Sequence, residues 1–228
     1  MKKSSLLILL AVLLASCKQT KSEGEIPVNT PLAKEMSIAE KIANAHGYEN
    51  WKNISKIEFT FNVNRGENHS ERSWSWEPKK DIVTFSADST VVYNRNDMDS
   101  TSIKIDRSFI NDKFWLLIPF QLVWDKGTTI SEPVMAEAPI SKAKMHKITL
   151  TYPSEGGYTP GDAYDLFYND DFLIKEWVYR RGNSETPSLT TTLEDYQDFN
   201  GLTLATMRKM ADNDNWSLFF TNINVITE

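Results

Sequence analysis

Residues 56–63 read KIEFTFNV, and this alternation of apolar and polar side chains is the clearest sign of the fold class. In an extended strand, Ile57, Phe59, Phe61 and Val63 lie on one face, and the polar residues between them lie on the other. One buried face and one solvated face are typical of antiparallel sheets. The stretch therefore predicts a half-buried β-strand near the start of a folded region.

Further apolar runs follow downstream, separated by turn-forming residues. The connections between the first of them hold about five residues, too few for a crossover helix, so neighbouring strands are expected to be antiparallel. The series predicts a mainly β protein of the α+β class, in which a single curved antiparallel sheet forms a half-open barrel. We predict strands at residues 73–76, 82–85, 90–93, 102–105, 147–152, 164–168, 172–180, 188–199, 202–210 and 216–225, with turns at 169–171 and 212–215.

A short N-terminal helix is predicted ahead of the first strand. Ser37 and Glu40 have the spacing of a capping box, in which each side chain accepts a hydrogen bond from the backbone N–H of the other residue. Ile38 and Ile42 fall on one helical face, and Gly47 is a natural C-terminal stop. The helix is therefore expected to run from Ser37 to the residue before Gly47.

Residues 111–124, NDKFWLLIPFQLVW, interrupt the pattern of strands. The run is strongly apolar but shorter than the roughly 20 residues that span a membrane, and Pro119 excludes a central strand. An apolar, kinked helical insert packed over the concave face of the sheet fits best. Two roles stay open for it, because it can complete the core as a lid or gate a ligand. The Gly- and Pro-rich stretch 153–161 is likewise either a surface connection or a binding loop.

Residues 1–16 have the organisation of a secretory signal, with two lysines ahead of the apolar run 6–15. Residues 14–17, Leu-Ala-Ser-Cys, resemble the lipobox of bacterial lipoprotein signals position by position. The resemblance implies cleavage before Cys17 and a lipid anchor on that cysteine, made of a thioether-linked diacylglycerol and an N-acyl chain such as palmitate. Several acyl chains on one residue are expected to hold the chain at a membrane.

Residues 17–35 are expected to form a flexible tether, because side chains that are almost all polar cannot offset the entropy of ordering. The folded β domain is then residues 36–228. Lys18 is not the aspartate that retains some lipoproteins in the inner membrane, so an outer-membrane anchor facing the periplasm is expected.

Composition narrows the classes of function. Cys17 is the only cysteine, so no disulfide can form within the chain. The net charge of −6 becomes −8 when the two lysines of the signal peptide are lost, which suits nucleic acid poorly. His46, His69 and His146 lack metal-ligand spacing, and no catalytic or phosphate-binding motif is present. We therefore expect a monomer with no enzymatic activity, metal or cofactor.

The order of elements, an initial helix, a half-open barrel and an apolar helical insert, resembles the LolA/LolB-like superfamily of lipoprotein carriers and receptors. The local resemblance lies in residues 48–54, 114–122, 199–202 and 216–223. Ala205 departs from the pattern, since relatives often have proline there. The resemblance implies that domain 36–228 binds acyl chains of lipids or lipoproteins on the concave face of its barrel.

A membrane-anchored envelope lipoprotein that binds a hydrophobic ligand is therefore the first hypothesis. The alternative is a structural or interaction lipoprotein whose core is filled by its own side chains and whose loops contact an envelope partner. Large aromatic area suits either a wide core or an acyl-chain pocket. Under the first hypothesis the predicted ligand-binding residues are Phe59, Phe61, Trp74, Trp76, Trp115, Leu116, Ile118, Phe120, Trp124 and Trp177.

Overall fold

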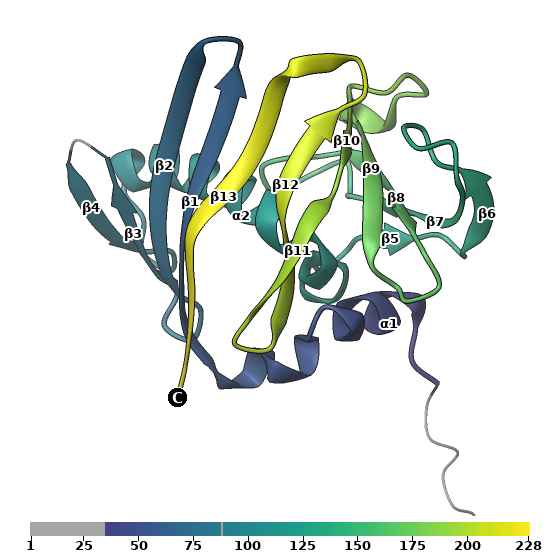
Figure 1. Ribbon diagram of the computed structural model, residues 1–228. Helices are drawn as coiled ribbons and strands as arrows, with labels where there is room; N and C mark the ends of the chain where they lie inside the picture. The colour runs from purple at the N-terminus through teal and green to yellow at the C-terminus, as the bar shows by residue number, and fades with distance from the viewer. Residues whose placement is uncertain (1–34, 88) are drawn as a thin grey trace, which may run out of the picture. The chain divides into compact units, whose positions relative to one another are not determined.

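The computed structural model describes residues 35–87 and 89–228, of which Met36–Glu228 form one compact unit. The expected signal peptide, the lipidated Cys17 and the tether up to residue 34 lie outside the described residues. Within the compact unit, the chain forms two antiparallel sheets and two α-helices, with short 3-10 turns at residues Tyr48–Asn53 and Arg181–Asn183 (Figure 1).

The first sheet has seven strands in the order β11-β12-β13-β1-β2-β3-β4. The alternating stretch that opens the sequence analysis lies in β1, where Ile57, Phe59, Phe61 and Val63 are all buried. Asn62 on the opposite face is buried as well, and its amide is satisfied by donating to the backbone carbonyl of Phe219 in β13. The strands are β1 (Ile54–Arg65), β2 (Asn68–Glu77), β3 (Ile82–Ser86), β4 (Thr90–Asn94), β11 (Glu194–Phe199), β12 (Leu202–Met210) and β13 (Asn213–Thr227).

The second sheet has six strands, in the order β10-β9-β8-β7-β5, with β6 also paired to β7. The short edge strands β5 and β6 were not predicted, because they lack an alternating apolar pattern. The predicted turn at 169–171 joins β8 to β9, whereas the turn predicted at 212–215 lies earlier, since β13 already begins at Asn213. The strands are β5 (Thr129–Ile130), β6 (Val134–Glu137), β7 (Lys144–Thr151), β8 (Ala163–Tyr168), β9 (Ile174–Arg180) and β10 (Leu189–Thr192).

The two sheets are joined by a strand that changes partner. The run predicted as one strand, 188–199, is interrupted at Leu193, so that β10 pairs with β9 and β11 pairs with β12. Asp195, just after the break, has a left-handed backbone with φ of 54°. The sheets do not close into a barrel, and the predicted fold class, a half-open and mainly antiparallel β structure with a helical insert, is confirmed. The curved sheet is divided in two at this bend.

Helix α2 (Ser100–Trp124) is longer than the predicted insert, and the strand predicted at 102–105 is wrong because these residues form its first turns. The cause is Asp99, whose carboxylate accepts hydrogen bonds from the backbone N–H groups of Thr101 (3.0 Å) and Ser102 (2.7 Å). Such an N-cap satisfies donors that have no partner within the helix.

A kink in α2 follows from Pro119. Leu117 has non-helical backbone angles (φ −113°, ψ 24°), and Pro119 has no N–H to donate to the carbonyl of Trp115. That carbonyl accepts instead from the guanidinium of Arg208 in β12, at 2.7 Å. Arg208 is 1% exposed, and burial lowers its pKa to about 10, so it stays charged at neutral pH. The carbonyl left free by the proline therefore forms one of the bonds between α2 and the first sheet.

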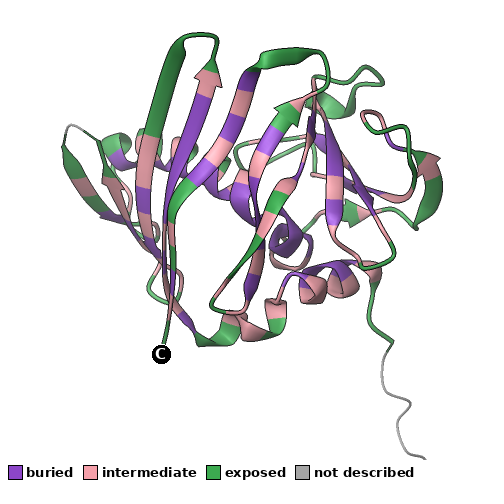
Figure 2. Ribbon diagram, viewed as in Figure 1, coloured by how far each residue is buried: buried purple, intermediate pink, exposed green. Residues whose placement is uncertain are grey.

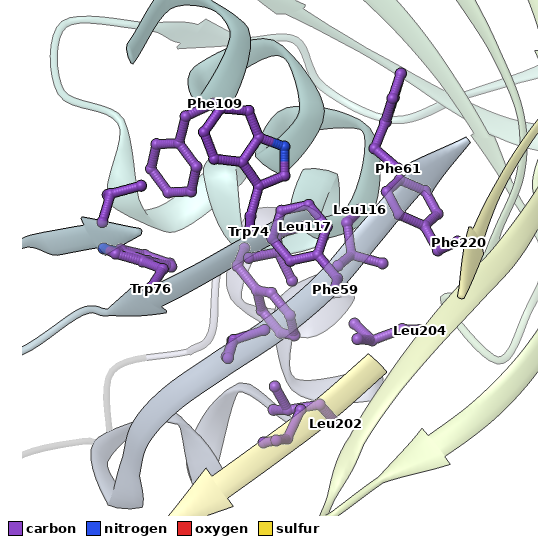
Figure 3. Packing of buried hydrophobic residues seen from close by; sticks show 14 of the residues in the cluster. Phe59, Phe61, Trp74, Trp76, Phe109, Leu116, Leu117, Leu202, Leu204 and Phe220 are labelled. Carbon is purple, nitrogen blue, oxygen red and sulfur yellow. The ribbon is translucent and has the colours of Figure 1, made fainter. Parts of the chain in front are cut away.

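The described part of the chain has two large apolar cores, and α2 contributes to both (Figure 2). Leu116, Leu117 and Phe120 pack against the first sheet, where Figure 3 shows Leu116 and Leu117 near Phe59. Ile118 and Leu122 belong to the second core, with side chains of α1 and the second sheet. Helix α2 therefore lies between the two sheets, and side chains on different faces of it pack into the two cores.

Helix α1 (Ile38–Ala45) begins with the predicted capping box, which is confirmed. At its C-terminal end the backbone of His46 accepts from Thr203 N–H (3.0 Å), and the Asn50 amide donates to the Gly201 carbonyl (2.9 Å). Gly47 adopts φ of 89°, and a Cβ there would lie 1.9 Å from the Gly201 oxygen. Glycine is required at this close approach.

The imidazole of His46 predicts a pH dependence of stability. It is 1% exposed, its Nδ1 lies 2.9 Å from the Thr203 carbonyl, and burial lowers its pKa to about 4. Because the unfolded chain has the ordinary histidine pKa of about 6.5, the neutral form stabilises the fold above that pH, and stability falls as pH drops toward 4. We expect a loss of about 2 kcal/mol between pH 7 and pH 5, measured by urea unfolding.

The control for this prediction is His69, which lies on the surface. His69→Gln should keep the loss of stability between pH 7 and pH 5, whereas His46→Gln should reduce it. An equal loss in the wild type and in His46→Gln would show that other groups cause the pH dependence.

Candidate functional site

A cavity of about 1500 Å³, partly open to solvent, lies along α2 and is lined by residues of both sheets. Phe61 and Leu218 line it from the first sheet, Tyr164 and Trp177 from the second, and Trp115 from the helix. The two sheets and the helix insert therefore build the wall together. None of the three elements encloses this space alone.

Aromatic rings make up much of the wall. Trp115 and Trp177 lie 4.3 Å apart between ring centroids, in an edge-to-face arrangement, and Phe114 lies 4.7 Å from Tyr164. Trp216 of β13 lies 6.4 Å from Trp115. Such rings give a large apolar surface of fixed shape, because they pack against one another.

Four of the ten predicted ligand-binding residues line the cavity, and these are Phe61, Trp115, Trp124 and Trp177. The other six do not line it but lie in the filled cores, where each is 6% exposed or less. The alternation along β1 places Phe59 and Phe61 on one face, but only Phe61 lines the open space. The six core residues are Phe59, Trp74, Trp76, Leu116, Ile118 and Phe120.

Basic side chains in the wall were missed by the sequence analysis. Seven line the cavity, against two acidic ones, Asp125 and Glu155, although the whole chain carries a net charge of −6. They come from six separate elements and loops and share no periodicity, so no sequence pattern could have revealed them. The seven are Arg65, Arg72, Arg95, Arg107, Lys113, Lys126 and Arg181.

Two fully buried carboxylates on α2 hold two of these arginines. Asp112 accepts two hydrogen bonds of 2.7 Å from Arg72 and one of 2.9 Å from the indole N–H of Trp74. Asp106 accepts from Arg95 at 2.9 Å. Paired and hydrogen-bonded charges can be buried at tolerable cost. The helix is therefore tied to the first sheet along the wall of the cavity.

The glycine-rich stretch 153–161 forms another part of the wall. Gly156, Gly157 and Tyr158 line the cavity, and the Tyr158 hydroxyl donates to Asp106 at 2.9 Å. Because this bond crosses from the loop to α2, the loop borders the cavity as well as connecting β7 to β8. This position is compatible with a surface connection and with a binding loop.

Near the C-terminal end of α2, the Tyr152 hydroxyl donates a hydrogen bond to the Asp125 carboxylate. Burial and the nearby Asp125 charge raise the pKa of Tyr152, so the phenol stays protonated at neutral pH.

Over residues 35–87 and 89–228, no cluster of three or more His, Cys, Asp or Glu side chains is arranged to hold a metal ion. In the same ranges, no helix is both long and apolar enough to cross a membrane.

The fold of this chain is similar to that of a solved structure. A LolA superfamily protein from Nitrosomonas europaea superposes with a TM-score of 0.50 at 10% sequence identity, covering 84% of this chain and 93% of that one. The chain has a LolA-like fold. The resemblance noted in the sequence is confirmed at the level of fold.

Two further structures resemble the LolA-like chain less closely. A putative outer membrane lipoprotein-sorting protein domain from Vibrio parahaemolyticus matches at TM-score 0.42 and 9% identity, covering 82% of this chain and 93% of that one. A DUF1329 family protein from Desulfovibrio piger matches at TM-score 0.41 and 9% identity, covering 82% and 91%. No protein-family model and no curated protein matches the sequence.

Proposed function

We propose that this LolA-like chain binds a hydrophobic ligand, an acyl chain of a lipid or lipoprotein, in the cavity beside α2. The observation that carries the proposal is the open, aromatic-walled space of about 1500 Å³, which lies between two filled cores. Ligand pockets typically measure about 300–1,000 Å³, so a long chain has room. The space is bordered by α2 and by the glycine-containing loop 153–161.

The alternative, a structural or interaction lipoprotein, predicts an interior filled by the protein's own side chains. Six of the predicted ligand residues do fill the cores, which fits that alternative. The cavity favours ligand binding, because an open space of this size, with aromatic rings in its wall, is not filled by the protein's own side chains. We therefore rank binding first and do not assign an enzymatic activity.

Co-purifying lipid provides the direct test of binding. Native mass spectrometry of the purified full-length chain should reveal a mass increment, and the organic extract should contain an acyl lipid. A protein that is consistently free of lipid, and that also does not bind an added long-chain alcohol or fatty acid, would contradict the proposal. Co-purifying lipid and binding of an added probe are both measured, because a ligand can be lost during purification.

We also propose that Cys17 carries the lipid anchor, which holds the LolA-like domain in the cell envelope at the outer membrane, facing the periplasm, as a monomer. The basis is the lipobox at residues 14–17. Cys17→Ser should move the protein from the membrane fraction to the soluble fraction and abolish labelling by an alkyne analogue of palmitate. Ser16→Ala, a control beside it, should retain both. Unchanged labelling of Cys17→Ser would rule out this anchor.

A further inference from the structure

Lys113 is a buried ammonium group in the wall of the cavity. It comes from α2, is 8% exposed, and lines the open space together with Trp124. Its Nζ lies 5.1 Å from the ring centroid of Trp76 and 5.8 Å from that of Trp124, with Phe109 at 6.0 Å. The rings attract the cation, but they offer none of its three N–H groups an oxygen acceptor.

Within residues 35–87 and 89–228, the side chain of Lys113 makes no hydrogen bond and no ion pair. The carboxylates that act on it from a distance are Asp81, Asp106 and Asp125, and the cation that acts on it is Arg95. Each of these carboxylates has a partner of its own, since Asp81 and Asp106 bind Arg95 and Asp125 accepts from Tyr152. The ammonium group therefore opens onto the cavity without an oxygen partner from the described residues, and a ligand bound there can supply one.

The surroundings of the cavity favour an anion as that acceptor. Four more basic residues line the same cavity and are exposed at the surface, and none of them forms a salt bridge with another described residue: Arg65, Arg107, Lys126 and Arg181. With Lys113 they make five basic side chains that form no ion pair within the described residues, although Arg181 bonds to Tyr179 and lies near Asp162; the acidic residues of the wall are Asp125 and Glu155. Such a local excess raises the concentration of anions near an opening, although the chain as a whole is acidic.

We propose that the ligand is an amphiphile with one anionic headgroup, a carboxylate or a phosphate ester, which pairs with the ammonium of Lys113 while its acyl chain lies against the aromatic wall. This inference rests on the proposed function, because it names the class of hydrophobic ligand that the cavity takes. The headgroup supplies the oxygen acceptors that Lys113 lacks, and the rings of Trp76 and Trp124 keep the pair away from water.

The protonation of Lys113 fits this role. Burial lowers its pKa to about 8, so in the free protein the group is charged at neutral pH and loses its proton in mildly alkaline solution. An anion paired with it would hold the proton. Affinity for an anionic amphiphile should therefore fall by about tenfold or more from pH 7 to pH 9.5, whereas Lys113→Arg, which stays charged, should not show this fall.

The test compares four probes on the purified full-length chain by isothermal titration: dodecanoate, dodecyl phosphate, dodecanol and inorganic phosphate. We expect the two anionic amphiphiles to bind at least about tenfold more tightly than dodecanol. Lys113→Met should remove this preference, because the anionic amphiphiles lose the paired ammonium while dodecanol does not. Lys104→Met removes a positive charge from the same helix, away from the cavity wall. It should change neither the affinity for the anionic amphiphiles nor that for dodecanol.

Each outcome has a distinct meaning. Equal binding of dodecanoate and dodecanol, or an equal loss of both in Lys113→Met, would overturn the headgroup assignment and leave the proposed function standing. Inorganic phosphate binding as tightly as dodecyl phosphate would assign the site to a free anion instead. Failure of every dodecyl probe would refute the proposed function itself. Should Lys113→Met not fold, the probe comparison on the wild type and the pH series with Lys113→Arg decide the question.

Discussion

Replacing Asp112 with alanine is expected to lower the free energy of unfolding by about 3 kcal/mol or more. Asp112 is fully buried on α2, and its removal leaves Arg72 without its two 2.7 Å hydrogen bonds. The indole N–H of Trp74, 3% exposed, also loses its acceptor. Water can reach Arg72 in part but not Trp74, so most of the cost comes from the unsatisfied buried donor and the lost tie between helix and sheet.

Urea unfolding at neutral pH measures the effect, with two further variants for comparison. Asp112→Asn keeps an acceptor for Trp74 but removes the charge, and it should fall between the wild type and alanine. Asp97→Ala, at an exposed position before the helix, should stay within about 0.5 kcal/mol of the wild type. A loss for Asp112→Ala no greater than that of Asp97→Ala would mean that α2 is held by apolar packing alone.

Placing a carboxylate in the cavity wall is expected to weaken acyl binding at least about tenfold. Ile110 of α2 lines the cavity and is only partly buried, so Ile110→Glu should fold while presenting a charge to the bound chain. Dodecanol is the probe for this measurement, because a neutral ligand separates the cost of desolvating the carboxylate from repulsion between two anions.

Ile103→Glu is the matched control. Ile103 lies on the same helix, two turns before Ile110, is 37% exposed and does not line the cavity. Its substitution should leave the affinity for dodecanol unchanged. Equal weakening in both variants would point to a general effect on α2, and no weakening in either would place the acyl chain elsewhere.

Much of the fold could be predicted from the sequence because local signals and tertiary packing agree. The alternation in 56–63 forms β1, and the capping box at Ser37 starts α1. The strand expected at 102–105 failed because four residues of apolar and polar alternation are also compatible with a helix, and the cap at Asp99 decides between them. The break at Leu193 has no local signal, since it depends on which sheet each half of the strand joins.

The candidate site was less predictable. Large aromatic residues could be recognised as either core or pocket, but only the path of α2 separates Phe59, which is packed, from Phe61, which lines the cavity. The basic residues of the wall are isolated in the sequence, and each looks like an ordinary surface charge. Lys113 in particular sits in the apolar run 111–124, and its burial is evident only once Trp76 and Phe109 are placed around it.

Photo-crosslinking with a dodecanoate that carries a diazirine in its alkyl chain tests the central claim, acyl binding beside α2, most directly. Peptide mapping should find the label in the cavity wall, on α2 around Ile110–Trp115 and on β9 around Trp177, with competition by unlabelled dodecanoate. Labelling that is instead spread over exposed apolar residues such as Val134 and Met135, 51% and 53% exposed, and that does not compete, would contradict the account.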